Sequence, residues 1–224
     1  EEAIEAYNKA LAIKPDYAEV FWNLSGSSES ISDSKNWVEK CNVDARSVRR
    51  VDDLVSEVII LPGVGSAGPY MDRLRKNSFD SAIIEHVQGG GRLIGICLGF
   101  QIMSSFSQED GGIEGLSLID AEVKRLENRE SHNEWEPFAF RKDQMNGQSF
   151  SSSEKLSRKT ILDGRVFYNH EYGVINNDPH AFTVPVSLKM NQYSGMFVKD
   201  KIIGIQFHPE KSQLTGLELI SMIL

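Results

Sequence analysis

The segment GGGRLIGICLGFQ, residues 89–101, places an apolar run directly before a cysteine and follows it with glycine. The apolar run at residues 93–96 is typical of a buried strand, and Gly95 and Gly99 flank Cys97. A strand that passes into a helix through such glycines can turn sharply and leave the cysteine side chain exposed above the sheet. The helix behind it would point its N-terminus at the sulfur and favour the reactive thiolate. A buried structural cysteine is the competing interpretation, since free cysteine is often buried.

Strands and helices alternate around this segment. Residues 56–61 (SEVIIL) predict a second buried strand, residues 69–91 one or two helices closed by glycines, and residues 98–107 (LGFQIMSSFS) a helix behind the cysteine. This alternation predicts an α/β fold whose mostly parallel central sheet is flanked by helices on both faces. The second half carries successive strand signals, among them residues 165–175 (RVFYNHEYGVI), and predicts an additional antiparallel β portion before an apolar helix at residues 214–224.

The first residues follow a different pattern. Apolar side chains recur at helical spacing through EEAIEAYNKAL, and Pro15 ends the predicted helix. Because this spacing resembles the second helix of a tetratricopeptide repeat, we predict a tetratricopeptide-like helical leader at residues 1–19 and one α/β domain at residues 20–224. About three such repeats are needed to bury a core. Three explanations of this leader therefore stay open: a fusion remnant, the edge of a truncated array and a plain surface helix. Residues 19–24 (EVFWNL) fit a strand or a continuing repeat helix.

Composition argues against several classes of protein. The 224 residues suit one domain with a short appendage, and the formal net charge of -8 argues against nucleic acid as a partner. The two cysteines are too few for a disulfide framework, and the sequence shows no membrane-spanning apolar run and no signal peptide. We therefore expect a cytoplasmic protein without a membrane partner. No metal-ligand cluster, P-loop or dinucleotide fingerprint stands out, so no metal and no cofactor are expected.

A second motif offers a base for Cys97. Of the five histidines, His208 stands out because it lies in GIQFHPEKS, residues 204–212, two positions before Glu210. In an extended chain the two side chains would point to the same side, and Pro209 between them suits the end of a strand. His208 could then accept the thiol proton while Glu210 fixes its tautomer. Alone, such a pair is more typical of a solvated surface; together with the cysteine segment it predicts a catalytic triad.

Three motifs in this order and spacing resemble those of the class I glutamine amidotransferases: PGVGS at 62–66, GICLGFQ at 95–101 and QFHPEKS at 206–212. Within that family the match is closest to the glutaminase subunit of imidazole glycerol phosphate synthase, and it runs from about residue 20 to the end. The resemblance implies an enzyme that hydrolyses L-glutamine and passes the ammonia to a synthase or cyclase subunit, a (β/α)8 barrel, within a heterodimer.

The resemblance also implies roles for individual residues. Cys97 would attack the carboxamide carbon of glutamine to form a glutamyl thioester, His208 would move the protons, and Glu210 would hold His208. Water would then release glutamate.

An oxyanion hole is implied at the Leu98 amide and at the loop formed by Gly63, Val64 and Gly65. In the family this loop can require a peptide flip, and glycines on both sides of Val64 make such a flip inexpensive.

Glutamine itself would be held by Gln101, one helical turn beyond the cysteine, with Glu171 and Tyr172 as further substrate-binding candidates. A helix-surface amide is the alternative interpretation of Gln101. His170, beside these two candidates, is better explained as a structural histidine than as a catalytic one.

The sequence departs from the pattern of its relatives at three places. Residues 23–30 (NLSGSSES) replace a small glycine- and asparagine-containing turn, and Glu134 and Glu136 stand where a His-x-Gly-Trp-Asn pattern has glycine and asparagine. The repeat-like leader is the third departure. These features leave open a paralogue that supplies ammonia to a sugar amidotransferase of surface-polysaccharide synthesis. A non-catalytic scaffold and a cysteine hydrolase for another amide are further alternatives, which the intact triad and Gln101 disfavour.

Overall fold

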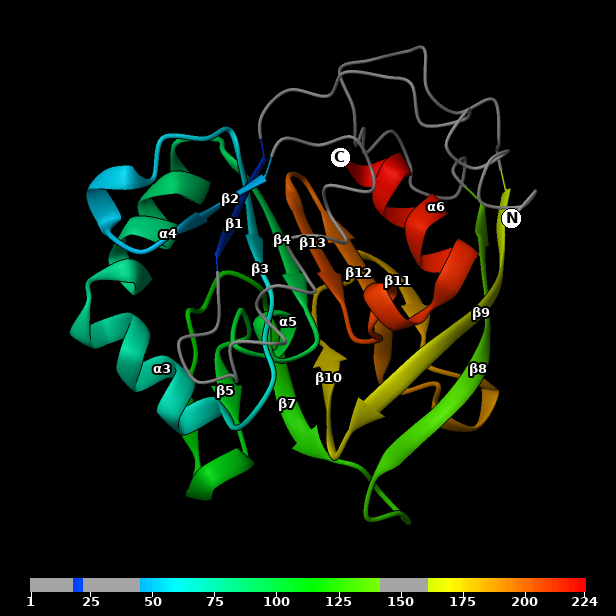
Figure 1. Cartoon of the computed structure of the whole chain (residues 1–224). Coiled ribbons are helices and arrows are strands. Elements are labelled where there is room, and N and C mark those ends of the chain that lie inside the picture. The colour runs from blue at the N-terminus through cyan, green and yellow to red at the C-terminus, as the bar shows by residue number, and fades with distance from the viewer. Residues whose placement is uncertain (1–17, 22–44, 142–160) are drawn as a thin grey trace.

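The computed structural model of the chain describes residues 18–21, 45–141 and 161–224 (Figure 1). The predicted leader lies outside the described residues except for its last two positions, and so does the variant turn at residues 23–30. Strand β1 covers Ala18–Phe21, so the predicted boundary between residues 19 and 20 falls within this strand. Of the two interpretations of residues 19–24, the strand is the one that holds for the described residues 19–21. The division into a leader and a domain stays a prediction.

A seven-stranded sheet forms the centre of the molecule, in the order β11-β12-β13-β4-β3-β1-β2. Five neighbouring strands are parallel, and β12 and β11 add to one edge in antiparallel orientation. Beyond β1, the strands are β2 (Ala45–Val48), β3 (Val58–Leu61), β4 (Arg92–Ile96), β11 (Phe182–Pro185), β12 (Ser194–Lys199) and β13 (Ile202–Ile205). The predicted α/β class with a mostly parallel sheet is confirmed.

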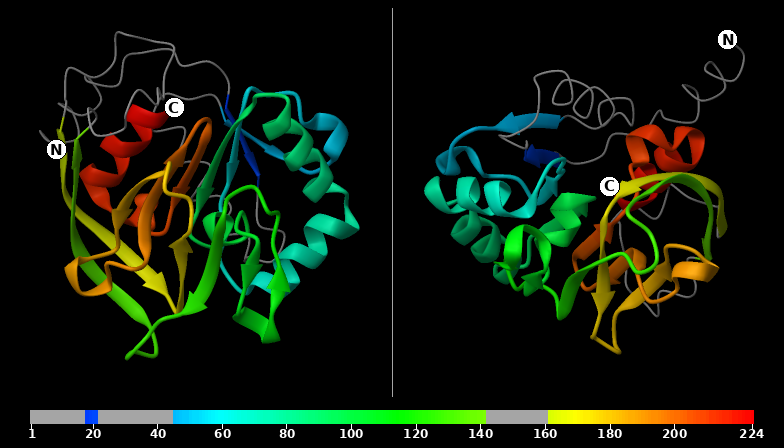
Figure 2. Two further views of the ribbon diagram at one scale, coloured as in Figure 1. Left: turned by 180° about the vertical axis from the view of Figure 1, so that it is seen from behind. Right: turned by 90° about the horizontal axis from the view of Figure 1, so that it is seen from below.

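Both faces of this sheet are covered (Figures 1 and 2). Helices α3 (Ala67–Lys76) and α4 (Phe79–Gln88) pack on one face, where Ile59 and Leu61 of β3 join their apolar cluster. Helix α6 (Gln213–Ile223) packs on the other face together with a long ribbon of β8 (His132–Arg141) and β9 (Ile161–His170). A strand buried on both faces needs apolar side chains at consecutive positions, which explains the continuous apolar runs in β3 and β4.

The predicted antiparallel portion is a smaller sheet in the order β10-β7-β5-β6. Its strands are β5 (Phe106–Ser107), β6 (Ile113–Glu114), β7 (Ala121–Arg125) and β10 (Tyr172–Asn176), of which β5 and β7 run parallel. Short 3₁₀ turns complete the described elements: η1 (Val51–Asp53), η2 (Glu109–Gly111), η4 (Leu188–Met190) and η5 (Pro209–Lys211). None of the described helices is long and apolar enough to cross a membrane.

Two sequence expectations were wrong in detail. The helix predicted over residues 98–107 is only four residues long, α5 (Leu98–Gln101). The carbonyl oxygens of Ile102 and Met103 instead accept hydrogen bonds from the N–H groups of Leu116 and Leu118. The following loop therefore occupies the carbonyl oxygens that would accept the next hydrogen bonds of a longer helix. The single strand predicted at residues 165–175 is interrupted at Glu171 and belongs to two sheets, because β9 pairs with β8 whereas β10 pairs with β7.

Candidate active site

Cys97 occupies the turn between β4 and α5, with φ 52° and ψ −111°. A residue other than glycine in such a sparsely populated region costs about 1–3 kcal/mol and persists only where its surroundings hold it. The Cys97 N–H donates to the carbonyl oxygen of Ile205 in β13 (2.7 Å), and the Cys97 carbonyl oxygen accepts from Gln101 N (3.1 Å). The turn is therefore fixed to the neighbouring strand on one side and to α5 on the other.

Glycines beside the cysteine allow a close approach that no other residue permits. A Cβ added to Gly99 would lie 1.7 Å from the carbonyl oxygen of Leu61, and one added to Gly95 would lie 2.8 Å from the Gly99 carbonyl oxygen. Gly63 meets the same turn, since a Cβ there would lie 2.7 Å from Gly99 N. The loop that follows β3 is consequently packed directly against the start of α5.

His208 and Glu210 lie just beyond the end of β13, the strand next to β4. His208 Nδ1 lies 2.7 Å from Glu210 Oε1, so the predicted contact forms. The chain between them is not extended as expected, because Pro209 begins the turn η5. Backbone bonds hold this turn in place: His208 N donates to the carbonyl oxygen of Phe167, and Ser212 Oγ donates to that of His208.

The charge on His208 depends on its neighbours. Burial alone lowers the pKa of His208, but the negative charge and hydrogen bond of Cys97, together with Glu210, outweigh burial and raise it to about 10. Cys97 and His208 are only 7% and 4% exposed, so water screens their interaction weakly. The arrangement favours an imidazolium at His208 at neutral pH.

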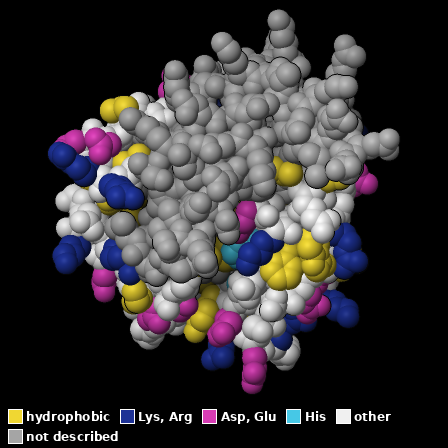
Figure 3. All heavy atoms as spheres, in the orientation of Figure 1, with side chains coloured by type: hydrophobic (Ala, Val, Ile, Leu, Met, Phe, Trp, Pro, Cys, Tyr) yellow, Lys and Arg dark blue, Asp and Glu magenta, His cyan; other side chains and the backbone are white. Residues whose placement is uncertain are grey.

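A cavity of about 620 Å³ opens above the cysteine. Eight of the predicted site residues line it: Val64, Gly65, Cys97, Leu98, Gln101, Glu171, Tyr172 and His208. The other two lie behind it, Gly63 packed against Leu98 and Glu210 against His208. On the face drawn in Figure 3 a histidine side chain reaches the surface between an acidic and a basic side chain. The fold thus gathers the predicted site residues, from four parts of the chain, around the sulfur of Cys97.

Comparison with known proteins decides the family. Residues 17–221 match the family profile described as "Glutamine amidotransferase class-I". The chain belongs to the class I glutamine amidotransferases. It is accordingly a glutamine amidotransferase enzyme, and the predicted resemblance is confirmed. A second profile, described as "TPR repeat", matches residues 1–25.

Curated relatives cover most of this amidotransferase. The imidazole glycerol phosphate synthase subunit HisH of Listeria monocytogenes is 31% identical over 200 residues, which span 88% of this chain and 89% of the relative. The subunit of the same name from Helicobacter hepaticus is 34% identical over 172 residues, 74% of each chain.

Solved structures share the fold of this amidotransferase at low sequence identity. The structure of PurLQS from Thermotoga maritima has a TM-score of 0.65 and 20% identity, and covers 94% of this chain and 96% of its own. A structure described as a glutamine amidotransferase has a TM-score of 0.64 and 16% identity, and covers 91% and 96%.

A second buried amide was missed in the sequence of this amidotransferase. Gln206 is fully buried, and its Oε1 accepts from Gln101 Nε2 (3.2 Å) while its own Nε2 lies 3.9 Å from Cys97 Sγ. Gln101 Nε2 also donates to the carbonyl oxygen of Tyr172 (2.7 Å). Gln206 directly follows β13 and lies two residues before His208, and this position is the sequence signal that could have found it.

The carboxylates of η2 were also missed. Glu109 and Asp110 line the cavity and accept hydrogen bonds from Ala67 N and Gly68 N at the start of α3. Burial raises the pKa of Glu109, the bond from Ala67 opposes this rise, and the charges of Asp110 and Glu171 add to it. Nothing local in the sequence reveals that these two carboxylates line the cavity. Their position depends on the loop after β5 folding back onto α3.

His170 lines the cavity but its ring is engaged. Its Nδ1 donates to the carbonyl oxygen of Tyr172 (2.7 Å), and its Nε2 lies 3.1 Å from Nδ1 of the fully buried His132. Burial, with smaller effects from nearby cationic groups, lowers the pKa of His170 to about 3 despite the opposing bond to Tyr172. Because the His170 ring stays neutral and is hydrogen-bonded on both nitrogens, it links His132 to the backbone of Tyr172.

Proposed function

We propose that this amidotransferase is the glutaminase subunit of a two-component synthase of the imidazole glycerol phosphate type. One observation carries the proposal: a strained cysteine at the end of β4 lies beside a histidine and a carboxylate within a cavity that suits a small amide substrate. Relatives named as subunits of imidazole glycerol phosphate synthase support the choice of synthase.

The proposed chemistry starts from a cationic His208 beside the Cys97 sulfur. The Cys97 thiolate attacks the carboxamide carbon of L-glutamine, and the electron pair of the C=O bond moves onto oxygen. The His208 imidazolium then gives its proton to the leaving nitrogen, so that ammonia departs and a glutamyl thioester remains. Neutral His208 next takes a proton from water, whose oxygen attacks the thioester, and glutamate and the thiolate are released. Glu210 holds the Nδ1–H throughout.

The developing oxyanion needs donors close to the sulfur. Leu98 contributes the first N–H of α5, which has no partner within the helix. The loop of Gly63, Val64 and Gly65 supplies the second candidate, since Gly65 has φ +106° and Val64 is exposed. A peptide between two glycines can rotate at small cost, so we propose that this loop donates after reorientation.

Substrate orientation is assigned to the other side of the cavity. Gln101 uses its amide nitrogen on Tyr172 and Gln206, which leaves Oε1 as the acceptor for the α-ammonium group of glutamine. Glu171 and Tyr172 border the same space.

The positive charge of His208 leads to a prediction about pH. His208 keeps its positive charge below its pKa of about 10 and loses it only as the pH rises through that value. Replacing it (His208→Gln) removes the charge, and an ordinary thiol is only about 1% ionised at pH 6.5. We expect iodoacetamide to alkylate Cys97 at least about 10-fold more slowly in this variant than in the wild type at pH 6.5. The difference should shrink towards pH 8.5.

Alkylation is measured by intact mass, with His180→Gln as the matched control because His180 is exposed and lies outside the cavity. A wild-type rate that falls with pH in parallel with the His208→Gln rate would contradict the activation of Cys97 by the His208 charge.

The identity of the partner is tested by asking whether the synthase takes its nitrogen from glutamine or from added ammonium. The chain, co-purified with the cyclase subunit from its own genome, should make the synthase use glutamine, whereas the cyclase alone should need added ammonium. We propose that this partner is a (β/α)8 barrel and that the complex is a cytoplasmic heterodimer. Glutamate release should be slow without the partner and rise when the partner and its ligand are present.

A complex that fails to form, or a cyclase that still requires ammonium, would argue against this synthase. Complementation of a sugar amidotransferase of surface-polysaccharide synthesis would then support the paralogue. One observation favours this paralogue: Glu134 and Glu136 stand where the pattern of the relatives has glycine and asparagine.

A further inference from the structure

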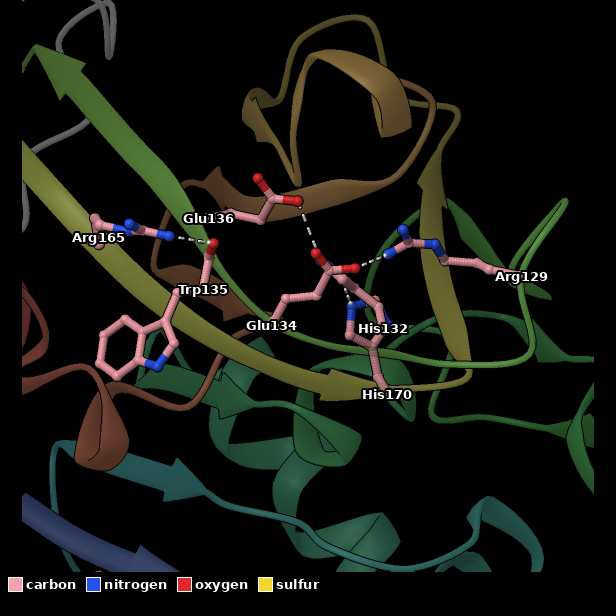
Figure 4. A network of polar contacts seen from close by, with 7 residues as sticks. All are labelled: Arg129, His132, Glu134, Trp135, Glu136, Arg165 and His170. Atoms are coloured by element: carbon pink, nitrogen blue, oxygen red, sulfur yellow. Dashed lines mark hydrogen bonds and ion pairs between the residues drawn. The ribbon is translucent and has the colours of Figure 1, made fainter.

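A histidine and two glutamates form a cluster on one face of β8 (Figure 4). His132, Glu134 and Glu136 alternate along the strand, so their side chains project to the same side. One ligand atom from each, a ring nitrogen or a carboxylate oxygen, lies within 4.8 Å of the others. This set offers one imidazole and two carboxylates to a common point.

Hydrogen bonds fix which nitrogen of His132 faces this point. His170 must donate from Nδ1, because its partner there is the carbonyl oxygen of Tyr172. In the neutral ring, His170 Nε2 is therefore an acceptor, and His132 must donate to it from Nδ1. Nε2 of a neutral His132 then carries a lone pair, and it lies 3.3 Å from Glu136 Oε1. Either a proton on Nε2 or a metal ion joins these two atoms.

The imidazole is held rigidly while the carboxylates can move. His132 is fully buried and stacks on Tyr168, with the ring centroids 4.9 Å apart. The side chains of Glu136 and Glu134 are 20% and 51% exposed, so an ion can reach them from solvent. Glu134 also pairs with Arg129 at 2.8 Å, but a carboxylate can hold the arginine with one oxygen and an ion with the other.

We propose that His132, Glu134 and Glu136 bind a divalent transition-metal ion, with Zn²⁺ as the best match. An imidazole with two carboxylates suits this class of ion. Bonds of about 2.0–2.2 Å place tetrahedral ligand atoms about 3.4 Å apart, so the carboxylates must close in by roughly 1.4 Å from the 4.8 Å limit. Rotation of the two exposed side chains supplies this movement, and water completes the coordination.

The second nitrogen of His132 already has the partner that a metal ligand needs. A coordinating histidine usually donates its other N–H to an acceptor that fixes its tautomer, and His170 Nε2 is that acceptor. The same chain of bonds ends at the Tyr172 carbonyl oxygen, which also accepts from Gln101. The pattern His-x-Glu-x-Glu was not singled out as a metal site in the sequence, because it forms a cluster only once the segment is a strand.

The test measures binding, independently of glutaminase activity. The full chain is freed of metal with a chelator and titrated with Zn²⁺ by calorimetry. We expect one Zn²⁺ per chain, and a loss of affinity of about 100-fold or more in Glu136→Gln, which keeps the size of the side chain. The exposed Glu130→Gln, on the preceding loop, is the matched control and should bind like the wild type. Mg²⁺ should bind far more weakly, since it prefers oxygen ligands.

A second measurement tests the nitrogen ligand. The visible absorption of bound Co²⁺ should change in His132→Asn, provided that circular dichroism shows this variant to be folded; if it is not, Glu134→Gln replaces it in the binding assay and should also weaken Zn²⁺. Binding that is equal in wild type and Glu136→Gln, or no binding to the wild type, would overturn the proposal. His132 Nε2 would then carry a proton.

Discussion

Replacing Cys97 by serine is expected to lower the rate of glutamate release from L-glutamine by about 10⁴-fold or more, since loss of a nucleophile removes the covalent route altogether. Serine keeps nearly the size of cysteine and the backbone bond to Ile205 does not involve the side chain. The fold should therefore persist while the chemistry stops. A hydroxyl in the same place ionises too poorly for the histidine beside it to compensate.

Glutamate is measured with the partner present, so that a slow basal rate does not mask the loss. As a second readout, a glutamine analogue that carries an electrophile should add its mass to the wild type and not to Cys97→Ser. Cys41→Ser removes the other cysteine and is the matched control, with both signals expected to survive. Glutamate release by Cys97→Ser near the wild-type rate would rule out the thioester.

Replacing Gly99 by alanine is expected to lower the free energy of unfolding by about 3 kcal/mol or more. The added Cβ would lie 1.7 Å from the carbonyl oxygen of Leu61, a backbone atom of β3 that cannot move without disturbing the sheet. In a domain of this size such a loss lowers Tm by about 10 °C. Activity should fall as well, because α5 would be pushed away from the end of β3 and Leu98 with it.

Thermal and urea unfolding of the two alanine variants measure this effect. Gly89→Ala is the matched control, because Gly89 has φ −72° and its added Cβ would lie 3.2 Å from the nearest atom, the carbonyl oxygen of Glu85. It should cost less than about 1 kcal/mol. If Gly99→Ala unfolds like the control, the packing of α5 against β3 is looser than described.

The sequence predicted the elements whose signal is local. The apolar runs of β3 and β4 have to be continuous because both of their faces are covered, and the glycines around Cys97 reveal a sharp turn. The family motifs then brought His208 to the same site. These features led to the α/β class and to most of the residues that line the cavity.

The elements that were missed depend on contacts between distant segments. β8 was not predicted, because Glu134 and Glu136 precede Phe138 and Phe140 at alternate positions, so acidic and apolar residues share one face of the strand. Helix α5 ends early because the N–H of Leu116 donates to the carbonyl oxygen of Ile102. Leu116 lies fourteen residues further along the chain. Residue spacing alone cannot report such competition for backbone groups.

The pairing of β4 with β13 sets a limit on how this enzyme can be switched. Ile96 lies opposite Ile205 in parallel register, and the Cys97 N–H bonds to the carbonyl oxygen of Ile205, so the proposed nucleophile Cys97 and the proposed base His208 follow adjacent strands of one sheet. Neighbouring strands stand about 4.8 Å apart, and sliding one past the other would break every bond between them. We expect a partner that accelerates hydrolysis to leave this pair unmoved and to act on the loop at Val64, which lies between β3 and α3 and belongs to no strand.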